Sequence, residues 1–382
     1  MAGEKEAGRL HVVHVYKDYW PPVLGGIERS MNWMVEGLAD RFDFTVLVNS
    51  RSGRTRERQE GAAHVIEVGE WGRALSAPLS PRFPLAMRRL RPDIWHFHMP
   101  NPTGDVSWLM ARPPGPVVAT YHSDIVRQRW AMRLYGPFLR AFLRRCHTIM
   151  PTSPRLVENS EILRPFAGKC RPVPLGMPLA PYARTAESGL AARAVKRRYK
   201  GFPLLVFVGI LRYYKGLQFL VSAMRGVENA RLAIIGEGPE GEKLRRLAEE
   251  LGVADRIDFA GRLPDQEVVA YLQAADVFVL PSHLPGEAFG LSQIEAMACG
   301  VPVVCTDLPT GVPFVNQHGV TGLVVPPADD TALAGAISEL LADPNRRFRM
   351  GEAALRRAHE MFSQEAMCGS LAGVYHSAVS GS

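Results

Sequence analysis

The chain has few cysteines for its length, and they form no metal-binding or disulfide pattern. Five cysteines occur among 382 residues, they are scattered, and no two of them stand in a C-x-x-C pair. Disulfide frameworks and structural zinc sites depend on closely spaced cysteines, so both are disfavoured. We therefore expect a protein of a reducing, cytoplasmic compartment.

Long apolar runs are also missing. The longest, such as 202–211, reach about half of the roughly twenty residues that a membrane-spanning helix needs. The apolar stretch near the N-terminus has about five residues, fewer than the apolar core of a signal peptide. We expect neither a transmembrane segment nor an export signal. No repeat of 20–50 residues is apparent, which disfavours solenoids and propellers.

What is present indicates a soluble globular protein of two domains with opposite charge. The chain is 47% hydrophobic and 22% charged, and its length fits two domains. Residues 1–200 hold 31 Lys and Arg against 17 Asp and Glu, a net charge of +14, whereas residues 201–382 hold 14 against 21, a net charge of −7. A basic half attracts anionic lipid, a phosphorylated acceptor or nucleic acid. Nucleic acid is not expected, because no aromatic single-strand platform or reading helix accompanies the charge.

Short apolar runs alternate with stretches of helical period in both halves, which is typical of βαβ units and parallel sheets. The prolines before residue 182 and the change of charge place a linker at 179–200. Two such sheets in series commonly bind a ligand at the carboxyl ends of their strands. The predicted strands are 10–16, 44–48, 94–97, 117–121 and 148–150 in the first half, and 204–208, 232–235, 257–259, 277–280, 303–305 and 323–325 in the second.

The segment 281–305 carries two carboxylates around a predicted helix, 289–298. Glu287 and Glu295 are eight residues apart, which is about 12 Å along a helix and too far for a glycosidase pair. They could instead hold two parts of one long ligand. The free amides of Phe289, Gly290 and Leu291 at the helix start would bind a pyrophosphate. A capped helix with solvated glutamates is the alternative.

Two further segments follow predicted strands and suit phosphate binding. Arg212 and Lys215 come just after strand 204–208, where two cations would neutralise a leaving diphosphate. Gly25 and Gly26 follow the first strand; they can adopt positive φ and let backbone amides approach a phosphate. Solvated cations and a plain turn are the respective alternatives.

These segments together resemble the retaining glycosyltransferases of family 4, which have the GT-B fold. Glu287 and Glu295 reproduce the E-x7-E motif of that family. Residues 21–28 look like its glycine-rich donor loop, and 209–216 look like its G-x-(L/F)-x-x-x-K-G phosphate-binding element. Residues 93–98 and 120–124 also match in kind and order.

The resemblance implies an α/β protein with two Rossmann-like doubly wound domains facing each other across a cleft. Residues 1–178 would bind the acceptor and 201–362 the nucleotide-sugar donor, with 363–382 as a helix crossing back to the first domain. The implied roles are phosphate binding and catalysis for Arg212 and Lys215, sugar binding for Glu287 and His122, ribose binding for Glu295, and donor contacts for Gly25, Gly26, Phe289, Gly290 and Leu291.

The implied activity is the retaining transfer of a mannose-like or glucose-like hexose from a UDP- or GDP-linked donor. The acceptor would be a glycan or lipid-linked molecule of cell-surface polysaccharide or glycolipid synthesis. No cofactor or metal is expected, because Arg212 and Lys215 would take the place of a metal and the chain has no D-x-D triplet. Two alternatives stay open: a GT-B glycan phosphorylase carrying pyridoxal phosphate, and a non-catalytic nucleotide-sugar-binding protein.

A competing motif lies at 236–241. GEGPEG has the G-x-G-x-x-G form, follows a predicted strand and precedes a helix, and Asp255 and Asp258 come about twenty residues later. The pattern alone would indicate a dinucleotide-binding dehydrogenase. Pro239 fits a first helical turn, and members of the family carry a similar turn without binding NAD.

The segment 126–145 predicts a basic amphipathic helix. Arg129, Arg133, Arg140 and Arg144 form a stripe at helical spacing beside Trp130, Leu134, Phe138 and Phe142, with Pro137 kinking or dividing the helix. Such a stripe suits an anionic membrane surface, so we expect a peripheral enzyme on the inner face of the membrane. A helix that buries its aromatic residues and solvates its arginines is the alternative.

Overall fold

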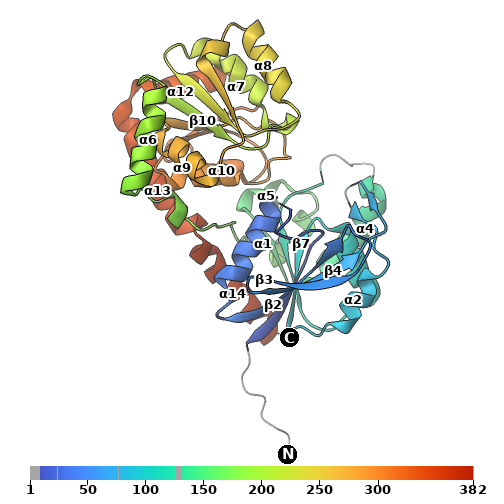
Figure 1. Ribbon diagram of the computed structural model, residues 1–382. Coiled ribbons are helices and arrows are strands. Elements are labelled where there is room, and N and C mark those ends of the chain that lie inside the picture. The colour runs from blue at the N-terminus through green and yellow to red at the C-terminus, as the bar shows by residue number, and fades with distance from the viewer. Residues whose placement is uncertain (1–8, 24, 76, 126–130, 382) are drawn as a thin grey trace, which may run out of the picture. The chain divides into compact units, whose positions relative to one another are not determined.

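The computed structural model describes residues 9–23, 25–75, 77–125 and 131–381, and the chain divides into two compact units. Unit 1 comprises residues 1–177 and 364–382, and unit 2 comprises residues 178–363. Each unit contains its own mainly parallel β-sheet with helices packed on it (Figure 1). The fold is therefore α/β, as the sequence predicts.

The sheet of unit 1 has seven strands in the order β3-β4-β2-β1-β7-β8-β9. Its pairings are parallel except that of β3 with β4. The strand order reverses between β1 and β7, which is where open α/β sheets bind ligands. The strands are β1 (Leu10–Val15), β2 (Phe42–Ser50), β3 (Arg56–Glu60), β4 (Ala63–Gly69), β7 (Ile94–Met99), β8 (Val117–Tyr121) and β9 (Thr148–Pro151), and β5 (Arg73–Ala74) pairs with β6 (Ala77–Pro78) separately.

The sequence analysis missed strands β3 and β4. β3 reads RERQE and is a largely exposed edge strand, so it lacks the apolar run that marks the buried strands. Its arginines instead pair with β4: Arg56 Nε and Arg58 Nε lie 2.5 and 2.9 Å from the Glu67 carboxylate. β3 thus depends on contacts between strands, which a search for apolar runs does not detect. β4 is internal and mostly buried, but His64 and Glu67 interrupt its apolar residues.

Helix α14 (Gln364–Ser380) belongs to unit 1 although it follows unit 2 in the chain. It packs beside α1 (Gly26–Gly37), where the Gln364 side-chain amide donates to the Trp33 carbonyl at 2.7 Å (Figure 1). The Gln364 backbone amide donates to the Met177 carbonyl at 2.9 Å. Further helices of unit 1 are α2 (Phe83–Arg89), α3 (Pro102–Ala111), α4 (Ala131–Arg145) and α5 (Pro154–Asn159).

The sheet of unit 2 is parallel throughout, in the order β12-β11-β10-β13-β14-β15. This is the Rossmann order, and its reversal lies between β10 and β13. The strands are β10 (Leu204–Val208), β11 (Arg231–Ile235), β12 (Ile257–Gly261), β13 (Val277–Leu280), β14 (Val303–Thr306) and β15 (Gly322–Val325). The helices are α6 (Ala186–Arg198), α7 (Leu217–Ala223), α8 (Gly241–Glu250), α9 (Asp265–Ala274), α10 (Leu291–Ala298), α11 (Val312–Val315), α12 (Asp330–Ala342) and α13 (Pro344–Phe362).

Residues 179–200, predicted as a linker, form part of unit 2 instead. They contain α6, which begins after Thr185 because the Thr185 hydroxyl accepts the Ser188 amide at 3.1 Å. The helix packs against α9, and its Lys196 forms an ion pair with Asp276. The prolines therefore precede a packed helix, and the basic run forms its last turn.

Among the described residues, no helix combines the length and the apolar character needed to cross a membrane.

Candidate active site

Two loops meet where the strand order of unit 2 reverses. Loop 209–216 follows β10, and loop 281–290 follows the neighbouring strand β13. The His283 amide donates to the Tyr214 carbonyl at 3.0 Å and so ties the loops together. Gly216 has a φ of 67°, and a Cβ there would collide with the Pro281 carbonyl. Glycine at 216 is what allows the two loops to lie this close.

Lys215 and Glu287, one from each loop, form a buried ion pair. The Ser282 hydroxyl donates to the same carboxylate at 3.1 Å. Burial opposes the charge of Lys215, but the attraction of Glu287, with contributions from Tyr214 and Glu295, outweighs it and raises the pKa of Lys215. Lys215 is therefore a cation at neutral pH, held in a fixed position.

Glu295 lies on α10 and is buried. Its charge also raises the pKa of Lys215, so it lies within electrostatic reach of the same ammonium group. The structure thus gathers Lys215, Glu287 and Glu295 at one end of the unit 2 sheet, although they come from three different segments. A buried cation among carboxylates, beside a helix start, is a suitable place for a ligand that carries both phosphates and hydroxyl groups.

The helix of this segment begins at Leu291, two residues later than the sequence predicts. Gly290 has a φ of 78°, which is left-handed and cannot continue into the helix. Phe289 precedes it with a buried side chain, 5.8 Å between ring centroids from Phe362. The amides of Leu291 and Ser292 lie in the first turn, where helical N–H groups have no partner within the helix and attract anions.

Arg212 lies in the same loop as Lys215, but its side chain is exposed. Its carbonyl accepts the Lys215 amide at 3.0 Å in the short turn 213–215. The charges of Lys215 and Arg212 both act on the Tyr214 phenol. Arg212 is therefore at the rim of the cluster, free to reach a ligand from the solvent side.

The G-x-G-x-x-G sequence at 236–241 is explained by loop packing. A Cβ on Gly238 would lie 2.5–2.8 Å from backbone atoms of Leu211, and one on Gly236 would collide with the Gly209 carbonyl. The Leu211 amide donates to the Glu237 carbonyl at 3.0 Å. The glycines thus let loop 236–241 lie against the loop that carries Arg212 and Lys215.

Gly25 and Gly26 do not adopt the positive φ that the sequence analysis expects. Gly25 has a φ of −83° and caps α1, and Gly26 is the first residue of that helix. A Cβ at 25 would meet the carboxylate of Glu28, so a larger residue there would displace the end of that side chain. Burial raises the pKa of Glu28, which lies at this helix start in unit 1.

His122 follows β8 in unit 1 and is buried. Its Nε2 lies 3.2 Å from His98 Nδ1, whereas its own Nδ1 has no partner among the described residues. Burial lowers the pKa of His122 to about 3, so the imidazole is neutral at physiological pH. This buried ring nitrogen is therefore open to a ligand or to an ordered water.

The predicted basic helix is α4, and part of the prediction is wrong. Arg129 and Trp130 lie outside the described residues. Phe142 is in the core of unit 1, not on the surface, and Pro137 does not divide the helix. Leu134 and Phe138 are 73% and 51% exposed, one turn apart. The exposed face also carries Arg133, Arg140 and Arg144.

Two site residues were missed by sequence reasoning. Ser282, which binds Glu287, is one of many serines in the chain, and nothing in its neighbours marks it. The Tyr375 hydroxyl of α14 forms hydrogen bonds with His14 of β1 and His96 of β7, which lie far from it in the sequence. Apolar spacing in the last helix shows that Tyr375 faces inward, but not which strands it meets.

Comparison with known proteins shows the family of this chain. Residues 25–176 match the glycosyl transferase 4-like domain, and residues 190–357 match the glycosyl transferases group 1 family. The chain is 33% identical to O-antigen chain mannosyltransferase C of Escherichia coli, over 96% of this chain and 98% of that protein. It belongs to the family 4 type of glycosyltransferases. This glycosyltransferase therefore has the GT-B fold, with two Rossmann-like units.

Two further relatives are informative. This glycosyltransferase is 37% identical to the GDP-mannose-dependent alpha-(1-6)-phosphatidylinositol monomannoside mannosyltransferase of Mycobacterium tuberculosis, over 92% of this chain and 86% of that protein. Among solved structures, sucrose-phosphate synthase of Thermosynechococcus elongatus superposes with a TM-score of 0.81 at 25% identity, covering 98% of this chain and all of that one.

Proposed function

We propose that this glycosyltransferase transfers a mannose-type hexose from a GDP-linked donor to a glycan or lipid-linked acceptor, with retention of anomeric configuration and without a metal. The observation that carries the proposal is the buried Lys215–Glu287 pair at the strand reversal of unit 2. The names of two relatives support the sugar, since both are mannosyltransferases and one depends on GDP-mannose.

The donor diphosphate would bind to Lys215, Arg212 and the first amides of α10. Lys215 stays charged because Glu287 lies against it, and the exposed Arg212 can close over the phosphates. Together they would stabilise the negative charge that develops on the leaving diphosphate, which is the role a metal plays in other glycosyltransferases. Glu295 would accept hydrogen bonds from the ribose hydroxyls.

Glu287 would accept hydrogen bonds from hydroxyl groups of the transferred sugar and stabilise its positive, oxocarbenium-like transition state. In unit 1, we propose that His122 forms a hydrogen bond with a sugar hydroxyl. In the reaction the C1–O bond to the diphosphate breaks, the acceptor oxygen bonds to C1 on the same face, and the acceptor proton passes to a phosphate oxygen. No protein base is needed, so the residues act by positioning and by charge.

Binding and turnover test the proposal together. GDP-mannose at about a hundred times its Kd should stabilise the protein by about 2.7 kcal/mol, a melting temperature rise of about 5 °C or more. UDP-glucose should give less. Transfer should continue at full rate in excess EDTA, and NMR of the product should show the donor's anomeric configuration. Stabilisation without turnover would indicate a binding protein, and loss of activity in EDTA would remove the metal-free mechanism.

We also infer that α4 binds anionic membrane surfaces. Leu134 and Phe138 project an apolar strip into solvent, and arginines on the same face would meet lipid phosphates. Each cation near an anionic leaflet adds about 1 kcal/mol. Membrane binding would bring the enzyme to a lipid-linked acceptor. The name of the mycobacterial relative indicates such an acceptor, a phosphatidylinositol monomannoside, for that enzyme.

Vesicle flotation tests the membrane contact. At low salt, most of the protein should float with vesicles containing phosphatidylserine, and none with purely zwitterionic ones. Leu134→Ser with Phe138→Ser should abolish flotation without lowering the melting temperature, because both side chains are exposed. Leu190→Ser, which changes a 61% exposed leucine of unit 2, should have no effect. Wild-type protein that stays with the soluble fraction would count against the contact.

A further inference from the structure

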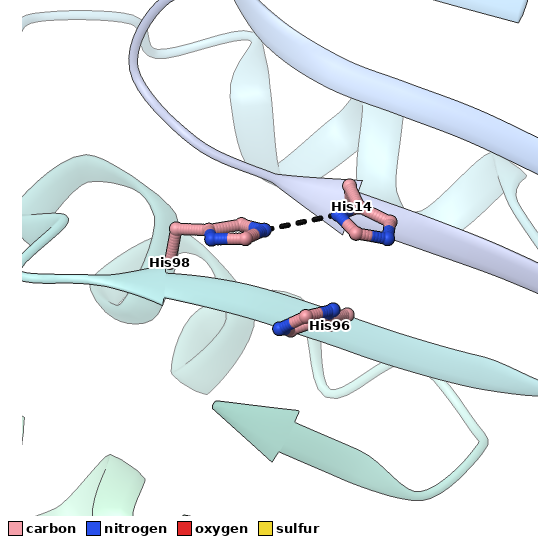
Figure 2. Close-up of side chains that lie close together, drawn as sticks. All are labelled: His14, His96 and His98. Carbon is pink, nitrogen blue, oxygen red and sulfur yellow. Dashed lines mark hydrogen bonds between the residues drawn. The ribbon is translucent and has the colours of Figure 1, made fainter. Parts of the chain in front are cut away.

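Six buried side chains of unit 1 form one continuous row of hydrogen bonds, which we call the histidine row. Figure 2 shows its middle, where His14 from β1 meets His98 from β7 beside His96. All six residues are at most 3% exposed. In order, the row joins His122 Nε2 to His98 Nδ1 (3.2 Å), His98 Nε2 to His14 Nδ1 (2.9 Å), His14 Nε2 to Tyr375 Oη (3.1 Å), Tyr375 Oη to His96 Nδ1 (2.7 Å) and His96 Nε2 to Thr120 Oγ1 (2.8 Å).

The histidines of the row are neutral. Burial lowers the pKa of His14 and His122 to about 3 and lowers those of His96 and His98 well below the usual value. Burial likewise keeps Tyr375 protonated by raising its pKa. A neutral imidazole has one N–H donor and one bare acceptor nitrogen, so each member of the row has a single proton to place.

Three arrangements place one proton in every link of the row. In one of them Tyr375 Oη accepts from both His14 and His96, and its own proton and the bare Nδ1 of His122 are then both unpaired among the described residues. In the other two, all protons point in a single direction along the row.

In the first single-direction arrangement, protons point from His122 towards Thr120; the Thr120 proton and the bare Nδ1 of His122 are then both unpaired, because His96 is the hydroxyl's one partner among the described residues. In the second, all protons point the opposite way: Thr120 donates to His96, and every later link donates in the same direction as far as His122. The N–H of His122 Nδ1 is then the one donor left unpaired, so burial favours this arrangement.

We propose that the histidine row, running through Tyr375 of α14, holds the proton of His122 on Nδ1 and presents an N–H donor, not a base, to the substrate. All four histidines then carry their proton on Nδ1. Tyr375 and Thr120 are positioning residues, because they set the direction of the row without touching substrate. The role towards substrate rests on the glycosyl transfer proposed above, whereas the proton positions do not.

A metal ion is the other use that three adjacent histidines suggest. Among the described residues, His14, His96 and His98 are the one group of possible ligands within 4.8 Å of one another. The ring planes of the three pairs meet at different angles: 28° for His96 and His98, 26° for His14 and His98, and 53° for His14 and His96. His14 Nδ1 and His98 Nε2 are already hydrogen-bonded to each other at 2.9 Å. Both nitrogens of each ring are also engaged in the row.

Nitrogen NMR of the full-length protein labelled with [15N]histidine tests the proposal without substrate. The wild type should show a protonated Nδ1 and a bare Nε2 for all four histidines, with His122 assigned from the signal lost in His122→Asn. Tyr375→Phe interrupts the row and Thr120→Val removes its terminal donor. In each variant the two single-direction arrangements become equally satisfied, so His122 should become a mixture of both tautomers.

The control is Tyr199→Phe, which removes a buried tyrosine hydroxyl that donates to Asp258 in unit 2 at 2.6 Å, and it should leave His122 unchanged. In a transfer assay both row variants should lower kcat to about half with KM for the donor unchanged, because half of the molecules carry the competent tautomer. A wild-type His122 protonated on Nε2, variants that leave it unmoved, or one equivalent of Zn²⁺ shifting His14, His96 and His98 would overturn the proposal. A protein that transfers no sugar but shows these tautomers would refute the proposed function alone.

Discussion

We expect Lys215→Met to lower the rate of glycosyl transfer by about a thousandfold, because it removes the buried cation that would stabilise the leaving diphosphate. The substitution also leaves the Glu287 carboxylate buried without its partner, at a cost of about 3–5 kcal/mol in the free energy of unfolding. Steady-state kinetics with saturating donor and thermal unfolding measure the two effects separately.

A double variant separates catalysis from stability. Lys215→Met combined with Glu287→Gln removes both charges of the pair, so the melting temperature should recover towards that of the wild type while transfer stays lost. Lys243→Met is the matched control, because Lys243 forms an exposed ion pair with Glu240 at 3.2 Å and such pairs contribute little. Near-normal turnover in the double variant would rule out Lys215 as the phosphate-binding cation.

We expect Gly238→Ala to lower transfer by about a hundredfold, because its Cβ would press on the backbone of Leu211 and move the loop of Arg212 and Lys215. Backbone cannot give way as a flexible side chain can, so we also expect a loss of about 1–3 kcal/mol in stability. Kinetics and chemical unfolding provide the measurements.

Gly241→Ala is the control for that loop. A Cβ at 241 would lie 3.5 Å from a methyl group of Leu211, an ordinary contact, and the position is the first residue of α8. Alanine favours a helix over glycine by about 1 kcal/mol, so activity and stability should match or slightly exceed those of the wild type. Equal activity in both glycine variants would mean that the close packing of the loops does not position Arg212 and Lys215.

The buried strands were predictable because each reads as a short apolar run between helical segments. β10 and β13 have the bounds that the sequence predicts, 204–208 and 277–280. β3 was not predictable in the same way, since its Arg58 stabilises that edge by pairing with Glu67 across strands. β4 is mostly buried, but its apolar residues are interrupted by His64 and Glu67. The helix that begins at Leu291 was placed two residues too early because left-handed backbone at Gly290 leaves no mark in the sequence.

By itself, the sequence determined the fold class, the family and the segments that carry the candidate site, because apolar periodicity and ordered motifs are local properties of the chain. Tertiary structure alone decided which side chains meet. The Lys215–Glu287 pair joins loops 72 residues apart, and the histidine row joins His14 of β1 to Tyr375 of α14, 361 residues later. Contacts of that range depend on strand order and on where α14 packs, and no local pattern encodes either.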